Sequence, residues 1–232
     1  MRSEQGSIDR DEAEAAIADN WPRLKNCYQE AGSAMTFAEG GVTLRFDVDV
    51  SGRTTGVEVI ESKLGNFAVE TCLGGVARAV RFPRPHGGGR ARVEYTLEFR
   101  STDERPVLEL PREVTDDVRV GLLAHLHATC GALGANDTEA TAYVDRRGHV
   151  ASAGFGGKTP LAPERAACAA NALAQAVVPH SHASDGDALV RLSFGMSDVE
   201  LDGARAAAAA ASKANARSRS KDRLASKGRR RR

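Results

Sequence analysis

Aromatic side chains and long apolar runs are both scarce in this sequence. Phenylalanine, tryptophan and tyrosine make up 5% of the 232 residues, so a folded core must be built mainly from aliphatic side chains and alanine. No stretch approaches the roughly 20 apolar residues that cross a bilayer. The opening residues, MRSEQGSIDRDE, also lack the apolar segment of a secretory signal. A chain that truly starts at Met1 is therefore expected in the cytoplasm, whereas a fragment of a longer protein leaves the compartment open.

Patterns of catalysis and of cofactor or metal binding are missing as well. The sequence has no G-x-S-x-G and no H-E-x-x-H. The stretch GFGGKTP (154–160) departs from the phosphate-loop pattern, because Ser152 stands where that pattern requires its first glycine. His125 and His127 are two positions apart on an expected helix, so they point about 200° apart and cannot face one ion. We therefore expect no enzyme activity, no cofactor and no metal.

The sequence does contain an ordered series of helix and strand patterns in residues 6–100. Apolar residues recur in steps of three and four over residues 13–31, as they do on one face of a helix. Asp9 and Glu12 are spaced as a capping box at the start of this helix. Pro22 is expected to kink or split it, because proline lacks a backbone donor and clashes with the preceding turn.

A hairpin, a second helix and a third strand follow in the same segment. Residues 42–50 alternate apolar and polar side chains, which predicts a strand with a buried face and a solvated face that carries Asp47 and Asp49. A glycine turn leads into the return strand of the hairpin. Asn66 can cap the next helix, and residues 93–99 alternate again. The order is helix, hairpin, helix, strand.

The same order recurs after residues 101–113, a charged stretch with two prolines that we interpret as a linker. Thr115–Asp117 indicate the start of a helix, and a hairpin and a second helix led by Pro163 come next. Residues 190–194 alternate as the last strand.

Constant spacing links the two series. Three residues of the first series have counterparts 96 positions later: Gly52 and Gly148, Cys72 and Cys168, Pro83 and Pro179. A turn glycine, a helix cysteine and a helix-ending proline at one offset indicate a duplication. The predicted domains are therefore residues 6–100 and 114–197.

Each predicted copy carries one cysteine on each of its two helices. Helices that pack on one sheet face can bring such thiols within disulfide range, and a bridge would add roughly 3–4 kcal/mol by the chain-entropy model. Four cysteines allow three pairings, and the duplication favours Cys27–Cys72 with Cys130–Cys168. Four reduced, buried cysteines, as in many cytosolic proteins, are the alternative.

Residues 6–100 resemble the AgmX/PglI C-terminal domain, a TonB-C-like module at the ends of myxobacterial envelope and gliding-associated proteins. The resemblance rests on Cys27-Tyr28, Ser51-Gly52-Arg53, Cys72 and Arg81-Phe82-Pro83. Residues 114–196 match only in outline, since Gly131 follows Cys130 and Val178-Pro179 replaces Phe-Pro. The predicted fold is α+β: two tandem TonB-C-like units, each with two helices packed on a three-stranded antiparallel sheet, and then a basic tail.

The resemblance implies a non-enzymatic protein-binding module of the cell envelope or periplasm, usually carried behind an N-terminal membrane anchor. Sheets of this kind lengthen by adding a partner strand, whose main-chain hydrogen bonds give affinity. We expect an envelope protein or peptide strand to pair with the third strand of the first copy. The residues proposed for this contact are Val93, Tyr95, Thr96, Leu97 and Phe99.

The end of the chain differs from the rest in charge. Residues 201–232 carry a net charge of +9, and the 200 residues before them carry −8. Basic tails bind nucleic acid or another anionic surface without reading sequence, by releasing counterions. The candidate residues within the predicted tail (198–232) are Arg217, Arg219, Lys221, Arg223, Lys227, Arg229, Arg230, Arg231 and Arg232. The alternative function is thus a cytosolic nucleic-acid-associated protein; a solvated extension is the simpler interpretation of the tail.

Overall fold

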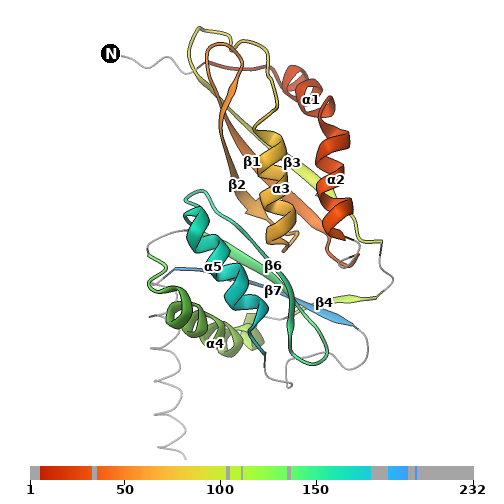
Figure 1. Ribbon diagram of the computed structural model, residues 1–232, viewed down its shortest axis with the longest axis vertical. Coiled ribbons are helices and arrows are strands. Elements are labelled where there is room, and N and C mark those ends of the chain that lie inside the picture. The colour runs from red at the N-terminus through yellow and green to blue at the C-terminus, as the bar shows by residue number, and fades with distance from the viewer. Residues whose placement is uncertain are drawn as a thin grey trace, which may run out of the picture.

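The computed structural model describes residues 6–32, 36–102, 105–110, 112–134, 137–178, 188–197 and 202, and these residues form two α+β units. The first unit carries a three-stranded sheet and the second a four-stranded sheet. Figure 1 shows the units end to end along the long axis, with helices covering one face of each sheet. A search of the described residues finds no helix with the length and apolar character that a membrane span requires. The predicted α+β class is confirmed.

The first unit has its strands in the order β2-β1-β3, and both pairs are antiparallel. Its elements are α1 (Arg10–Ala18), α2 (Trp21–Gly32), β1 (Gly40–Val48), β2 (Thr54–Ser62), α3 (Phe67–Ala77) and β3 (Ala91–Phe99). The predicted alternation is present in β1, where Val42, Leu44, Phe46 and Val48 are buried. Val50, predicted to continue this strand, lies beyond its end and is 56% exposed. The strand stops because Asp49 Oδ1 accepts from the backbone N–H groups of Ser51 (2.8 Å) and Arg53 (3.0 Å), which starts the hairpin turn.

The first predicted helix is split into α1 and α2. Pro22 lies in the first turn of α2, where its missing donor and fixed φ are tolerated. The side-chain amide of Asn20 donates to Ala16 O (3.1 Å) at the end of α1. The first unit therefore contains three helices, where two are predicted from the sequence.

Of the two predicted helix caps, one forms and one does not. Asn66 Oδ1 accepts from Val69 N (3.1 Å) at the start of α3, as expected. Asp9 occupies the N-cap position of α1, but its side chain accepts no capping hydrogen bond. Its carboxylate and that of Glu12 face His86 Nε2 at 3.8 and 3.7 Å instead. The predicted capping box is therefore wrong, since the Asp9 carboxylate lies toward the His86 side chain and makes no capping hydrogen bond.

The second unit repeats the order helix, hairpin, helix, strand and adds a short strand in front. Its elements are β4 (Val107–Glu109), α4 (Arg112–Cys130), β5 (Glu139–Val144), β6 (Val150–Gly156), α5 (Pro163–Ala174) and β7 (Leu189–Gly195). Strands β6, β5 and β7 correspond to β2, β1 and β3. The strand order β4-β7-β5-β6 therefore contains the order of the first unit, with β4 added next to β7. Helix α4 starts three residues before Thr115, where the sequence predicts its start. The sheet of the second unit has four strands, whereas three are predicted.

The extra strand β4 comes from the segment interpreted as a linker. It pairs in parallel with the start of β7. Leu189 N donates to Pro106 O and Leu110 N donates to Arg191 O, both at 3.0 Å. The guanidinium of Arg191 also forms an ion pair with Glu109. The charged residues that suggested a linker thus hold a strand at the sheet edge.

Both units use glycine in the same way at the hairpin turn. Gly52 has a φ of +84°, and a Cβ there would lie 2.1 Å from Phe82 O. Gly148 has a φ of +83°, and a Cβ there would lie 2.1 Å from Val178 O. In each unit the carbonyl of the glycine accepts a backbone hydrogen bond from that same residue, at 2.9 and 2.7 Å. The 96-residue offset therefore corresponds to one repeated contact; Pro179 lies outside the described residues.

Each unit is cross-linked by the disulfide that the spacing predicts. Cys27 of α2 is bonded to Cys72 of α3, and Cys130 of α4 to Cys168 of α5. The sequence separations are 45 and 38 residues. In the second unit the bridge joins the two helices of the unit, whereas in the first it joins α2 to α3 and leaves α1 outside the bridge.

Replacing both Cys130 and Cys168 by alanine should lower the free energy of unfolding by about 4 kcal/mol, because the unfolded chain regains the freedom that the loop closure removes. Denaturant titration measures this change. Non-reducing peptide mapping of the unaltered chain is the control and should recover the two bridges within units. Bridges between units would contradict the fold described above.

Candidate partner-binding site

Strand β3 forms an outer edge of the first sheet. All nine of its residues pair with β1, from Gly40 opposite Phe99 to Val48 opposite Ala91. No described strand pairs with its other side. The chain before α1 forms backbone hydrogen bonds just ahead of β3, where Gly6 N donates to Arg90 O (2.8 Å) and Ser7 N to His86 O (3.1 Å). The outer backbone groups of the strand are therefore available to a further strand.

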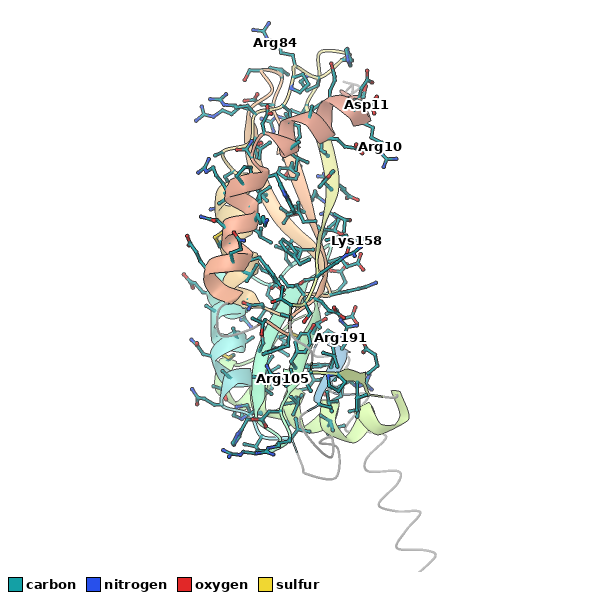
Figure 2. The ribbon with its side chains drawn as sticks, turned by 90° about the vertical axis from the view of Figure 1, so that its right-hand side faces the viewer. Arg10, Asp11, Arg84, Arg105, Lys158 and Arg191 are labelled. Atoms are coloured by element: carbon teal, nitrogen blue, oxygen red, sulfur yellow. A yellow bond between two sulfur atoms is a disulfide. The ribbon has the colours of Figure 1, made fainter. Side chains whose placement is uncertain are left out.

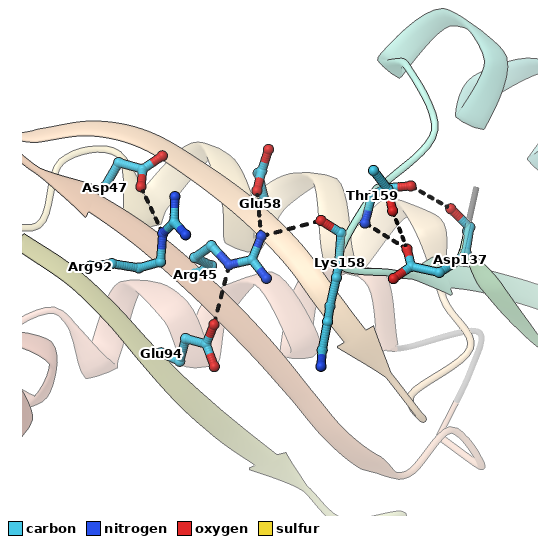
Figure 3. A network of polar contacts seen from close by, with 9 residues as sticks. Arg45, Asp47, Glu58, Arg92, Glu94, Asp137, Lys158 and Thr159 are labelled. Atoms are coloured by element: carbon cyan, nitrogen blue, oxygen red, sulfur yellow. Dashed lines mark hydrogen bonds and ion pairs between the residues drawn. The ribbon is translucent and has the colours of Figure 1, made fainter. Parts of the chain in front are cut away.

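Three side chains on the polar face of β3 bond to side chains of β1. Arg92 Nε donates to Asp47 Oδ1 and Arg45 Nε donates to Glu94 Oε1, each at 3.2 Å. The hydroxyls of Thr96 and Thr43 lie 2.9 Å apart. Figure 3 shows these ion pairs in a row across the sheet. The strand face that is predicted to be solvated thus carries a ladder of opposite charges.

The core face of β3 changes character along the strand. Ala91, Leu97 and Phe99 are buried. Val93 and Tyr95, between them, are half-buried although they point to the same face. These two side chains lie at the outer edge of the core, where the apolar surface is incompletely covered.

A groove separates this part of β3 from α1. It has a volume of about 550 Å³, and its apolar lining includes Ile8, Ala13, Val93 and Tyr95. Arg10 and Glu14, an ion pair at 2.8 Å, lie at its rim. A strand added to β3 would place every second side chain on the core face, and therefore into this groove. The groove is the structural feature that sequence reasoning missed, because it depends on how the split helix turns.

The remaining sheet edges are more fully occupied. In the second unit, β4 covers the start of β7, which is the strand equivalent to β3. The C-terminal half of β2 meets the end of β6, where Gly157 N donates to Val59 O (3.3 Å). Within the described chain, β3 is therefore the longest strand edge that has no such neighbour.

The contact between β2 and β6 belongs to an extensive joint between the units. Tyr143 of β5 is fully buried and packs on Phe37, with ring centroids 5.2 Å apart. Its hydroxyl lies 3.1 Å from both the carbonyl and the N–H of Glu39. Thr141 Oγ1 donates to Ser62 O at 3.0 Å. One aromatic side chain of the second unit thus completes the core of the first.

The sheet side of the joint is polar. Arg45 Nη1 donates to Lys158 O at 3.2 Å. Thr159, the residue after Lys158, donates two hydrogen bonds to Asp137 (Figure 3). Lys158 and Arg191 project from the same side of the molecule in Figure 2. They line a cleft of about 540 Å³ together with acidic residues of both units. The two signs of charge are mixed there, so the cleft selects no particular ligand charge.

Glu70 is the buried charge at the centre of the joint. It lies on α3 and is 3% exposed. Its Oε1 accepts from Ser62 Oγ (2.5 Å) and Asn66 N (3.2 Å), and its Oε2 accepts from Phe155 N (2.8 Å) of the second unit. Burial raises the pKa of Glu70 to about 7, and the three hydrogen bonds oppose this shift. The carboxylate therefore joins the units through bonds from both of them.

Gly154 of β6 provides the space that Glu70 occupies. A Cβ on this residue would lie 1.9 Å from Glu70 Oε1 and 2.4 Å from Asn66 N. The neighbouring Gly156 is equally close to Ser62 N, at 2.4 Å. The glycines that suggest a phosphate loop in the sequence are thus explained by the close approach of two units.

The residues proposed from the sequence fall into two groups. Val93, Tyr95, Thr96, Leu97 and Phe99 all lie on β3, with Thr96 on the polar face and the others on the core face. The basic tail lies outside the described residues except for Asp202, so anion binding by the tail stays a prediction.

A further group of side chains could hold a cation. The ligand atoms of Asp9, Glu12 and His86 lie within 4.8 Å of one another, the one such group found among the described residues. All three side chains are exposed, and exposed acidic groups commonly lie together without an ion. His125, by contrast, bonds to Ala172 O at 3.1 Å through its Nε2.

Comparison with known proteins adds no relative: no protein-family model, curated protein or solved structure matches this chain.

The stability of the chain should depend on pH through Glu70. A pKa raised from 4.5 to about 7 means that the folded chain binds this proton more tightly than the unfolded chain. The stabilisation of the folded chain by this proton is complete below about pH 4.5 and is lost as the pH rises through 7. The free energy of unfolding should fall by about 3 kcal/mol over this range. Denaturant titrations from pH 4.5 to 8 on the unaltered chain and on Glu70→Gln test this, because other titrating groups cancel in the difference. The difference in stability should change with pH in that window; a constant difference would contradict the assignment.

Substitution of Gly154 should destabilise the contact between the units, whereas substitution of a glycine on the adjoining helix should not. Gly154→Ala forces a methyl group into Glu70 and should cost roughly 2 kcal/mol or more in unfolding free energy. Gly74→Ala is the matched control, since nothing lies within 4 Å of its Cβ and the site is helical. It should stabilise the chain by roughly 0.5–1 kcal/mol. Thermal unfolding compares the two variants, and equal stability would refute the close approach at Gly154.

Proposed function

We propose that this chain is a non-enzymatic protein-binding module of the cell envelope, which takes an extended segment of a partner protein on the edge of β3. The observation that carries the proposal is a nine-residue strand edge with which no described strand pairs, beside an apolar groove under α1. The edge supplies backbone donors and acceptors, and the groove supplies a place for alternate side chains. Together these are the two components of strand addition.

The internal comparison of the two units supports the same mode of binding. In the second unit, β4 lies along the strand equivalent to β3 and is held there by backbone hydrogen bonds and one ion pair. The fold of these units therefore accepts a strand at this position. In the first unit the corresponding edge has no strand partner from the described chain, and we assign that place to the partner protein.

The disulfides support an envelope location. Bridges of this kind form and persist in oxidising compartments, such as the bacterial periplasm, and are rare in the cytosol. Two of them are present, one in each unit. They weigh against the alternative of a cytosolic nucleic-acid-associated protein, and the net charge of −8 over the first 200 residues does so too. The tail remains the candidate contact for an anionic surface.

The resemblance to the AgmX/PglI C-terminal domain supports the proposal through residues that the structure gives a role. The hydroxyl of Tyr28, in the Cys27-Tyr28 motif, lies 2.7 Å from Ala38 O and 3.0 Å from Arg100 O. It ties α2 to the chain just before β1 and just after β3. Gly131 stands at the corresponding place of the second unit, and we propose the binding role for the first unit alone.

The binding role predicts a selective effect of charge on β3. Extended peptides are first selected from a displayed library on the unaltered protein. Their affinity for Tyr95→Lys should be about tenfold lower or more, because the substitution places a charged side chain in the apolar groove. Leu108→Lys is the matched control on the outer strand β4, where Leu108 is 49% exposed. It should bind the same peptides within about twofold. Calorimetry measures the affinities, and circular dichroism confirms that both variants are folded. Equal affinity of all three proteins would refute strand addition at β3.

A further inference from the structure

Three aromatic rings meet at the C-terminal end of β3. The ring centroids of Tyr28 and Phe99 lie 5.0 Å apart, and those of Trp21 and Phe99 lie 6.4 Å apart, both with near-parallel planes. Phe99 is buried, whereas Trp21 is 39% exposed. Since the chain has a single tryptophan and few aromatics, an exposed indole stacked on this cluster is an unusual use of apolar surface.

These rings form the floor of a pocket of about 590 Å³ between α2 and the end of β3. Lys25, Gln29, Glu98 and Arg100 are among the residues at its rim. Among the described residues, no ion pair or side-chain hydrogen bond engages these four polar side chains. An apolar floor with a rim of unengaged donors and acceptors has the composition of a binding pocket. Buried pockets with tryptophan, tyrosine and arginine also dominate the energetics of protein interfaces.

We propose that this pocket binds an aromatic side chain of the partner segment whose backbone pairs with β3. The inference rests on the proposed function for its peptide context. Phe99 and Tyr95 lie on the same face of one strand, and Val93 is two positions further. An added strand therefore carries its core-facing side chains past the groove under α1 and then into the aromatic pocket.

The spacing along β3 defines the partner segment further. Phe99 is four residues from Tyr95 and six from Val93, which corresponds to roughly 13–20 Å of extended chain. Between them, Leu97 is 2% exposed and closes the core face. The partner segment should therefore place a small or medium apolar side chain in the groove and an aromatic side chain four to six positions away in the pocket.

Trp21 provides a direct signal for occupancy, because it is the one fluorophore of its kind in the chain. Titration of the unaltered protein with N-acetyl-phenylalaninamide should shift its emission to the blue and saturate. N-acetyl-alaninamide, the matched control, should leave the emission unchanged. N-acetylglucosamine tests a sugar ligand, which could also stack on the indole. A response to the sugar and not to the phenylalanine amide would overturn the proposal, as would no response to either.

A second experiment separates this inference from the proposed function. Peptides selected on the unaltered protein should bind Trp21→Ala about tenfold more weakly, and Trp21→Phe should restore most of that affinity. If Tyr95→Lys weakens the peptides but Trp21→Ala does not, strand addition stands and the aromatic pocket is refuted. If the phenylalanine amide binds while Tyr95→Lys has no effect on the peptides, the pocket stands and the role of the β3 edge fails.

Discussion

The buried carboxylate of Glu70 is the contact on which the arrangement of the two units depends. It accepts hydrogen bonds from Ser62 and Asn66 of its own unit and from Phe155 of the other, and Gly154 leaves the space for it. A carboxylate without these partners would be very unfavourable at such a place. The bonds therefore fix β6 against α3 and the C-terminal half of β2. Each sheet alone would have two open edges. At the joint the edge strands β2 and β6 meet each other, so these two edges are covered by the chain itself.

The outer edges then differ between two units of the same topology. The turn glycines Gly52 and Gly148 make the same contact, and each unit has its disulfide across the helical layer. In the second unit, however, the chain leading into α4 forms β4 and covers the start of β7. In the first unit the helix α1 lies next to β3 and leaves a groove instead of a strand. Of the two corresponding edges, one is therefore covered in part by a strand of the chain itself, and the other is the edge for which we propose a partner strand.

Much of this fold could be predicted from local sequence patterns. The alternation from Val42 to Val48, the Asn66 cap and the cysteine pairs depend on short-range periodicity or on a repeated spacing, and each is present. The β3 residues could be proposed because this alternating strand follows the glycine-rich loop at residues 86–89, which we expect to let the strand separate and pair again. The failures depend on contacts that no local pattern encodes: Asp9 turns to His86, which is distant in sequence, and Glu109 holds β4 through Arg191. The joint was missed for the same reason, since Glu70 looks like any first-turn acidic residue of a helix.

The central claim, that a partner adds a strand to β3, is tested most directly by amide hydrogen exchange of the full chain with and without a selected peptide. New backbone hydrogen bonds protect the amides that make them. Binding should therefore slow exchange within residues 91–99, at alternate positions that face away from β1, and leave β4 and β7 unchanged. Protection confined to any other element, with β3 exchanging as in the unbound chain, would contradict the account.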